Sequence, residues 1–132
     1  MLTVTSTCQG TTDSMQNIIK SPNYPQKYPN HALCKWSIRS PPNTQIEINL
    51  EEFATEKRHD KLEIFDGHDS TASKIRTLSG DLHEQSVGEY RLYIESSRNE
   101  LFLKFTSDTS YNRKGFLIHY ALRQGKHEIR IL

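Results

Sequence analysis

Residues 34–50 read CKWSIRSPPNTQIEINL and carry the clearest structural signal in the chain. Apolar and polar residues alternate in this stretch on both sides of the Pro41-Pro42-Asn43 break. A period of two is typical of a β-strand that buries one face and exposes the other. Proline interrupts such a strand because it lacks the backbone donor that a sheet requires. The stretch therefore predicts two half-buried strands separated by a turn.

The same alternation returns four times further along the chain. Its apolar positions are Leu62 and Ile64, then Leu92 and Ile94, then Leu101, Leu103 and Phe105, and finally Phe116, Ile118 and Tyr120. Polar residues Ser96 to Asn99 lie between the second and third runs, which are therefore candidates for a hairpin. No long window repeats at the helical period. Several short strands with turns between them predict a β-sandwich or barrel with little helix.

Composition places the chain among single globular domains and excludes some partners. The 132 residues are 34% hydrophobic and 25% charged, which suits a thin sandwich with two solvated faces. Seventeen Lys and Arg against sixteen Asp and Glu give a net charge of +1, so no bulk field attracts nucleic acid or an anionic membrane. No apolar window approaches the roughly 20 residues of a membrane span, and any export signal is expected outside the given sequence.

The usual signatures of catalysis are missing from the sequence. Its six histidines include no HExxH pair, and neither a GxSxG elbow nor a glycine-rich phosphate loop occurs. We therefore expect no enzyme activity. Two cysteines, Cys8 and Cys34, are compatible with one disulfide or with two buried thiols, and no CxxC motif suggests redox chemistry.

A set of motifs closely resembles the CUB domain family. The motifs are Ser21-Pro22-Asn23-Tyr24-Pro25, Tyr28-Pro29-Asn30, Cys34 to Ile38, Phe53-Ala54-Thr55-Glu56, Asp60 to Gly67, and Asn99 to Tyr120. The resemblance implies a two-sheet antiparallel jelly-roll β-sandwich, and it implies that Cys8 pairs with Cys34. It divides the chain into an N-terminal extension (1–7), a CUB domain (8–122) and a C-terminal tail (123–132).

The sequence departs from the family pattern at the second disulfide. The loop from Glu56 to Asp60 is shorter than in the family and omits its cysteine, and Ser79 stands where the partner cysteine is expected. Both halves of that disulfide are therefore absent together. The stretch 81–91 is also longer than the usual connection.

The resemblance further implies a calcium ion at one edge of the domain. Its ligands here would be Glu56, Asp60 and Asp108, with the Ser110 carbonyl and the Asn112 side chain. Calcium takes six to eight oxygen ligands, which several acidic loops can supply together. Two features count against this site. The loop is shortened, and Gln16 and His59 stand where calcium-binding relatives commonly have tyrosines. The alternative interpretation is that these are ordinary loop acids, paired in water with Lys57, Arg58 or Arg113.

We therefore predict a noncatalytic extracellular module that serves adhesion or assembly, within a secreted protein or a cell-surface ectodomain. Its partner would be an extracellular protein, engaged through a Lys or Arg side chain that the acidic loops accept. One alternative is a structural spacer in a larger receptor or matrix protein, without a metal. Another is a glycan- or heparin-binding module, which would require the basic run Arg123 to Arg130.

Overall fold

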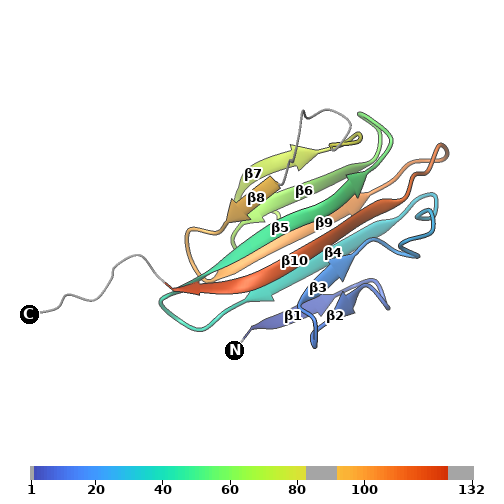
Figure 1. The fold of residues 1–132 in the computed structure, drawn as a ribbon. Helices are drawn as coiled ribbons and strands as arrows, with labels where there is room; N and C mark the ends of the chain where they lie inside the picture. Colours follow the sequence, from blue (N-terminus) through green and yellow to red (C-terminus); the bar gives the residue numbers. More distant parts are fainter. Residues whose placement is uncertain (1, 83–91, 125–132) are drawn as a thin grey trace, which may run out of the picture.

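The computed structural model describes residues 2–82 and 92–124, and every regular element in these ranges is a β-strand. The strands are β1 (Thr3–Ser6), β2 (Thr12–Asp13), β3 (Ile18–Lys20), β4 (Leu33–Arg39), β5 (Thr44–Ala54), β6 (Lys61–Asp66), β7 (Ser73–Leu78), β8 (Leu92–Glu95), β9 (Glu100–Thr106) and β10 (Gly115–Gln124). They form two antiparallel sheets, ordered β1-β4-β9-β6-β7 and β2-β3-β10-β5-β8 (Figure 1). This confirms the predicted all-β, two-sheet jelly-roll sandwich.

The core lies between the sheets and includes the apolar positions that the alternation identified, together with others such as Ile19, Phe53 and Leu78. Trp36 and Ile38 of β4, for example, are buried in one cluster with Ile46 and Ile48 of β5. One irregularity in β5 changes the alternation. Leu117 pairs with Glu52 while Ile118 pairs with Leu50, so Glu51 is an extra residue. A bulge of this kind shifts the phase of the strand, and Leu50 and Phe53 consequently both point inward.

A set of aromatic rings connects the centre of the core to one end of the sandwich. Phe116 packs edge-on against Trp36 and Phe105, with centroid distances of 5.9 and 5.2 Å. Phe105 in turn contacts the ring of Tyr28, edge-on at 5.0 Å. Edge-to-face pairs add about 1 kcal/mol each beyond the area that they bury. The Tyr28 ring is therefore held rigidly where its hydroxyl leaves the apolar core.

The predicted hairpin between residues 92–94 and 101–105 is wrong. Strand β8 pairs with β5 in one sheet, whereas β9 pairs with β4 and β6 in the other. The connection crosses between the layers because Ser96 bonds to the backbone of Ile46 and the Asn99 amide bonds to the Ser40 carbonyl. These contacts hold the two ends of the Ser96–Asn99 turn against different sheets.

The segments outside the expected domain contribute to the sheets. Residues Thr3–Ser6, which we expected within an N-terminal extension, form β1 and pair with β4. At the other end, β10 runs to Gln124, and the remainder of the expected tail lies outside the described residues. The same holds for most of the long 81–91 connection. The domain limits of 8 and 122 stay a prediction.

Cys8 and Cys34 form a disulfide that closes a loop with a sequence separation of 26. Where the resemblance places a second disulfide of the family, this chain has a hydrogen bond instead. The Arg58 N–H donates to Ser79 Oγ at 3.0 Å, so the shortened loop still contacts the end of β7. Stability against unfolding therefore depends on a single covalent link.

The double variant Cys8→Ala/Cys34→Ala is expected to lose about 3 kcal/mol of unfolding free energy, because the unfolded chain regains the entropy of the open loop. Urea unfolding of the oxidised parent and the variant measures the difference. The parent treated with a reductant is the control and should unfold near the variant's midpoint. Equal midpoints for the oxidised parent and the variant would contradict the expectation.

Candidate metal centre

Sheet register brings three acidic side chains to one end of the sandwich. Asp60 precedes β6 and Asp108 follows β9, and these strands pair with Lys61 opposite Thr106. Glu56 follows β5 at the start of the same short loop. One carboxylate oxygen from each of the three acids lies within 4.8 Å of the others. The shortened loop therefore does not keep Glu56 away from the other two acids.

The Tyr28 hydroxyl joins the two ends of this loop. It donates to Asp60 Oδ2 at 2.6 Å and accepts the Glu56 N–H at 3.1 Å. Burial and the hydrogen bond to Asp60 raise the pKa of Tyr28, so the hydroxyl keeps its proton. Sequence reasoning missed this contact, because Asp60 lies 32 residues away.

Asp60 is the most enclosed of the three acids, with no exposed surface. Its Oδ1 accepts the backbone N–H of Asp108 at 2.9 Å, which ties the second loop to the first. Both carboxylate oxygens thus accept from neutral donors, and no Lys, Arg or His of the described residues lies within ion-pair distance of Asp60. A buried carboxylate without a positive neighbour is costly, and a bound cation would remove that cost.

Glu56 has an oxygen without a partner. Its Oε1 is buried and makes no hydrogen bond within the described structure. Burial, followed by the charge of Asp108, raises the pKa of Glu56, whereas the Ser110 N–H lowers the pKa of Asp108. Two ligands of one calcium ion can lie about 5 Å apart, given metal–oxygen distances of 2.3–2.6 Å. The three acids therefore fit a calcium ion in both charge and spacing.

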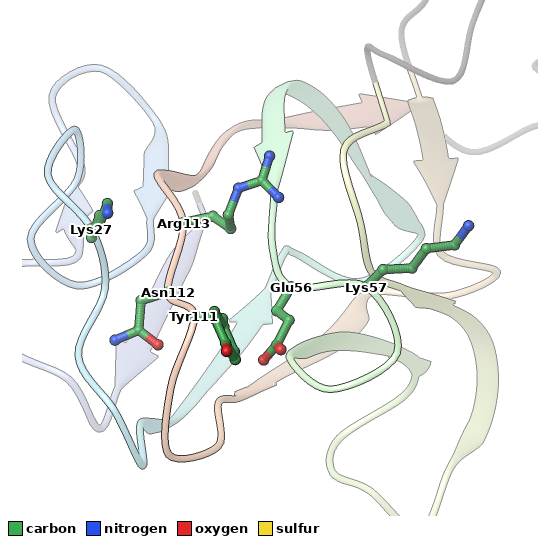
Figure 2. Close-up of a pocket in the computed structure, with 6 residues that line it drawn as sticks. All are labelled: Lys27, Glu56, Lys57, Tyr111, Asn112 and Arg113. Carbon is green, nitrogen blue, oxygen red and sulfur yellow. The ribbon is translucent and has the colours of Figure 1, made fainter.

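The two remaining predicted ligands are placed differently. Ser110 lies beside the acids because its N–H donates to Asp108 Oδ1 at 3.2 Å. The Asn112 amide donates to Asn30 Oδ1 at 2.7 Å, and Figure 2 places Asn112 on the opposite side of Tyr111 from Glu56. The structure thus gathers Glu56, Asp60 and Asp108, with Ser110 adjacent and Asn112 apart.

The alternative of ordinary loop acids predicted ion pairs with Lys57, Arg58 or Arg113. Between described residues, the ion pair of Arg113 is with Asp81 at 4.0 Å, and none joins Lys57 or Arg58 to the three acids. The basic group nearest to the acids is the His59 ring, whose Nδ1 lies 3.7 Å from Asp108 Oδ2. The three carboxylates therefore gather without Lys or Arg to neutralise them.

An open pocket of about 780 Å³ lies beside the acids (Figure 2). Three loops line it, namely the proline-rich segment 21–30 before β4, the β5–β6 loop and the β9–β10 loop. The residues are Lys27, Glu56, Lys57, Tyr111, Asn112 and Arg113. Sequence reasoning named Glu56 and Asn112 as ligands but missed the pocket, because it depends on three segments distant in sequence.

Comparison with known proteins assigns the fold and its relatives. The profile of the CUB domain family matches residues 8–120. Human Tolloid-like protein 1 is 32% identical over 122 residues, and human Procollagen C-endopeptidase enhancer 2 is 34% identical over 125 residues. These alignments cover 89% and 90% of this chain but 11% and 28% of the relatives. The chain thus spans less than a third of the length of either relative.

Solved structures agree with this fold. The CUB1-EGF-CUB2 domain of human MASP-1/3 superimposes with a TM-score of 0.69 at 23% identity, covering 81% of this chain and 41% of that one. The crystal structure of the MASP-1 CUB2 domain bound to Ca²⁺ gives a TM-score of 0.65 at 21% identity, covering 86% of this chain and 98% of that one. Residues 2–82 and 92–124 contain no helix long and apolar enough to cross a membrane.

Proposed function

Because the chain belongs to the CUB domain family, we propose that it is a noncatalytic protein-interaction module whose ligand-binding edge is ordered by a calcium ion. The observation that carries the proposal is the gathering of Glu56, Asp60 and Asp108 around a buried oxygen without a partner. The chain matches only part of two longer relatives, which supports a place within a larger protein. We propose that this protein is secreted or exposed on the cell surface.

The carboxylates of Glu56, Asp60 and Asp108 would hold the ion, with the Ser110 carbonyl as a further ligand. Asn112 would join them only if its side chain turned away from Asn30. Calcium bound to this fold has a precedent in the MASP-1 CUB2 structure. The ion would neutralise three carboxylates and link the β5–β6 loop to the β9–β10 loop. Two loops joined in this way present one fixed surface to a partner.

We propose further that the partner approaches this edge with a Lys or Arg side chain. Asp108 is the acid best placed to receive it, because 38% of its side chain is exposed while Asp60 is buried. Carboxylates that already bind an ion are fixed in position, and a charge-assisted hydrogen bond to them loses little further entropy.

The two alternatives predict different behaviour. A structural spacer would bind neither calcium nor a partner at this edge. A heparin-binding module would need the basic run from Arg123, yet Arg123 itself lies within 3.9 Å of Glu47 and 3.5 Å of Glu95. The rest of that run lies outside the described residues. The calcium-ordered edge is therefore the proposal that the described structure favours.

Calcium at ten times its dissociation constant is expected to raise the thermal midpoint of the oxidised domain by about 3–6 °C, since such binding adds about 1.4 kcal/mol. Scanning calorimetry with calcium and with excess EDTA measures this shift. The variant Asp108→Ala should show no response to calcium. The matched variant Asp69→Ala, in the β6–β7 turn, should respond like the parent. A calcium response that survives in Asp108→Ala would reject the site.

A further inference from the structure

The pocket beside the candidate calcium site carries unpaired positive charge. Lys27 and Lys57 are both exposed, and no Asp or Glu of the described residues lies within ion-pair distance of either. They come from separate loops, the proline-rich segment and the β5–β6 loop, and both line the same hollow (Figure 2). Arg113 adds a third cation on the β9–β10 loop, although it shares its charge with Asp81.

The carboxylate in the pocket does not balance these cations. Of the six lining residues that the structure describes, three are basic and Glu56 alone is acidic, and Glu56 also belongs to the candidate calcium site. When its charge is committed to calcium, the other charged side chains of this described lining are all positive. Cations that line one hollow give it a positive potential, which favours an anionic group that enters it. In Figure 2 Glu56 lies in the middle of the view, with Lys27 on one side of it and Lys57 on the other, so the cations lie around the pocket.

Tyr111 lies beside Glu56 (Figure 2). Its side chain is part of the pocket wall, and the residue is 76% exposed. Its backbone φ is +63°, a left-handed conformation that costs a non-glycine residue about 1 kcal/mol. A large aromatic ring held out in water on such a backbone is an amphipathic contact surface of the kind enriched at interfaces.

We propose that this pocket receives an acidic side chain of the partner, next to the point where the partner's Lys or Arg meets the calcium-bearing edge. The inference rests on the proposed function and adds to it the chemistry of the partner. The bound segment carries a basic residue followed closely by acidic ones. The basic residue lies against Asp108, the acidic ones enter the pocket that Lys27 and Lys57 line, and Tyr111 packs against the bound segment.

Peptide titrations followed by NMR of the calcium-loaded domain test this arrangement. The probes are two capped peptides that differ at two positions, one containing Lys-Glu-Glu and the other Lys-Gln-Gln. We expect the glutamate peptide to bind at least fivefold more tightly at about 50 mM salt, and we expect the difference to shrink at about 0.5 M salt, where screening is strong. Equal affinities, a preference for the glutamine peptide, or no binding of either peptide would overturn the inference.

Two charge-reversed variants locate the effect. Lys27→Glu/Lys57→Glu is expected to abolish the preference for the glutamate peptide, with calcium binding retained. Lys35→Glu/Arg76→Glu, on exposed positions of β4 and β7, reverses the same charge elsewhere and should keep the preference. If both pairs of substitutions reduce binding equally, general charge and not the pocket accounts for it, and the inference fails.

The same titrations in EDTA separate the inference from the proposed function. A preference for the glutamate peptide that persists without calcium, and is lost in Lys27→Glu/Lys57→Glu, supports the pocket even if no calcium response is found. A domain that binds calcium through Asp108 and shows no preference retains the proposed function and loses the acidic partner.

Discussion

Replacing Asp60 by alanine is expected to abolish calcium binding and to lower the unfolding free energy in the absence of calcium by about 2 kcal/mol, because two lost buried hydrogen bonds outweigh the relief of one buried unpaired charge. The carboxylate accepts the Tyr28 hydroxyl and the Asp108 N–H. Its loss leaves both donors without a partner beside a fully buried position, at roughly 1–3 kcal/mol each. Urea unfolding in EDTA measures the stability, and calorimetric titration of the folded variant measures calcium binding.

Two further variants separate the structural role of Asp60 from its role as a ligand. Asp108→Ala removes a half-exposed ligand and should abolish calcium binding while unfolding close to the parent in EDTA. Asp60→Asn keeps one acceptor oxygen, so its unfolding free energy should lie between those of the parent and Asp60→Ala. If Asp60→Ala and Asp108→Ala unfold at the same urea concentration, Asp60 is not an internal anchor and the assigned hydrogen bonds contribute little.

The alternation of apolar residues predicted which faces are buried but not which strands are neighbours. Leu92 and Leu101 both face the interior as expected, yet they lie in different sheets. A period of two specifies a buried face, whereas pairing depends on contacts at the ends of strands. Here those contacts are the hydrogen bonds of Ser96 to Ile46 and of Asn99 to Ser40, which no local pattern encodes.

At the candidate site, too, the sequence predicted the residues but not their contacts. The residue types and family motifs identified Glu56, Asp60 and Asp108, and the structure brings all three together. Sequence could not show that Asp60 is buried or that Tyr28 connects its carboxylate to Glu56. Both facts follow from the packing of the Tyr28 ring on Phe105, a contact between residues far apart in the chain.

The short β5–β6 loop illustrates why loop length alone is a poor guide. Fewer residues suggested a shorter reach for Glu56, which counted against calcium. In the structure the loop turns tightly, with Arg58 in a left-handed conformation and the N–H of Asp60 bonded to the Glu56 carbonyl. The turn folds Glu56 back over Asp60. The backbone angles and the hydrogen bond to Ser79 set the direction in which the loop carries Glu56, and this direction matters more here than the length of the loop.

Gly115→Ala is expected to destabilise the domain by at least about 4 kcal/mol, because a side chain at this position has no room. A Cβ on Gly115 would lie 1.9 Å from Ser21 Oγ and 2.8 Å from Ser21 Cβ. Ser21 is fully buried, and its hydroxyl accepts the N–H of Phe116 at 3.0 Å, so it cannot move aside without breaking that bond. Overpacking and a lost buried hydrogen bond together produce losses of this size. Urea unfolding in EDTA provides the measurement.

Gly10→Ala is the matched control for the backbone conformation. Gly10 has a φ of +75° and Gly115 one of +95°, but a Cβ on Gly10 would meet no atom within 4 Å. Its variant should therefore lose only about 1 kcal/mol, the cost of the left-handed backbone. Equal losses in the two variants would contradict a steric role for Gly115. The Ser21 contact also joins the segment that carries Lys27 to the β9–β10 loop, which ends at Gly115. If Gly115→Ala still folds but pushes this segment and this loop apart, its affinity for calcium and its affinity for the peptide should both fall.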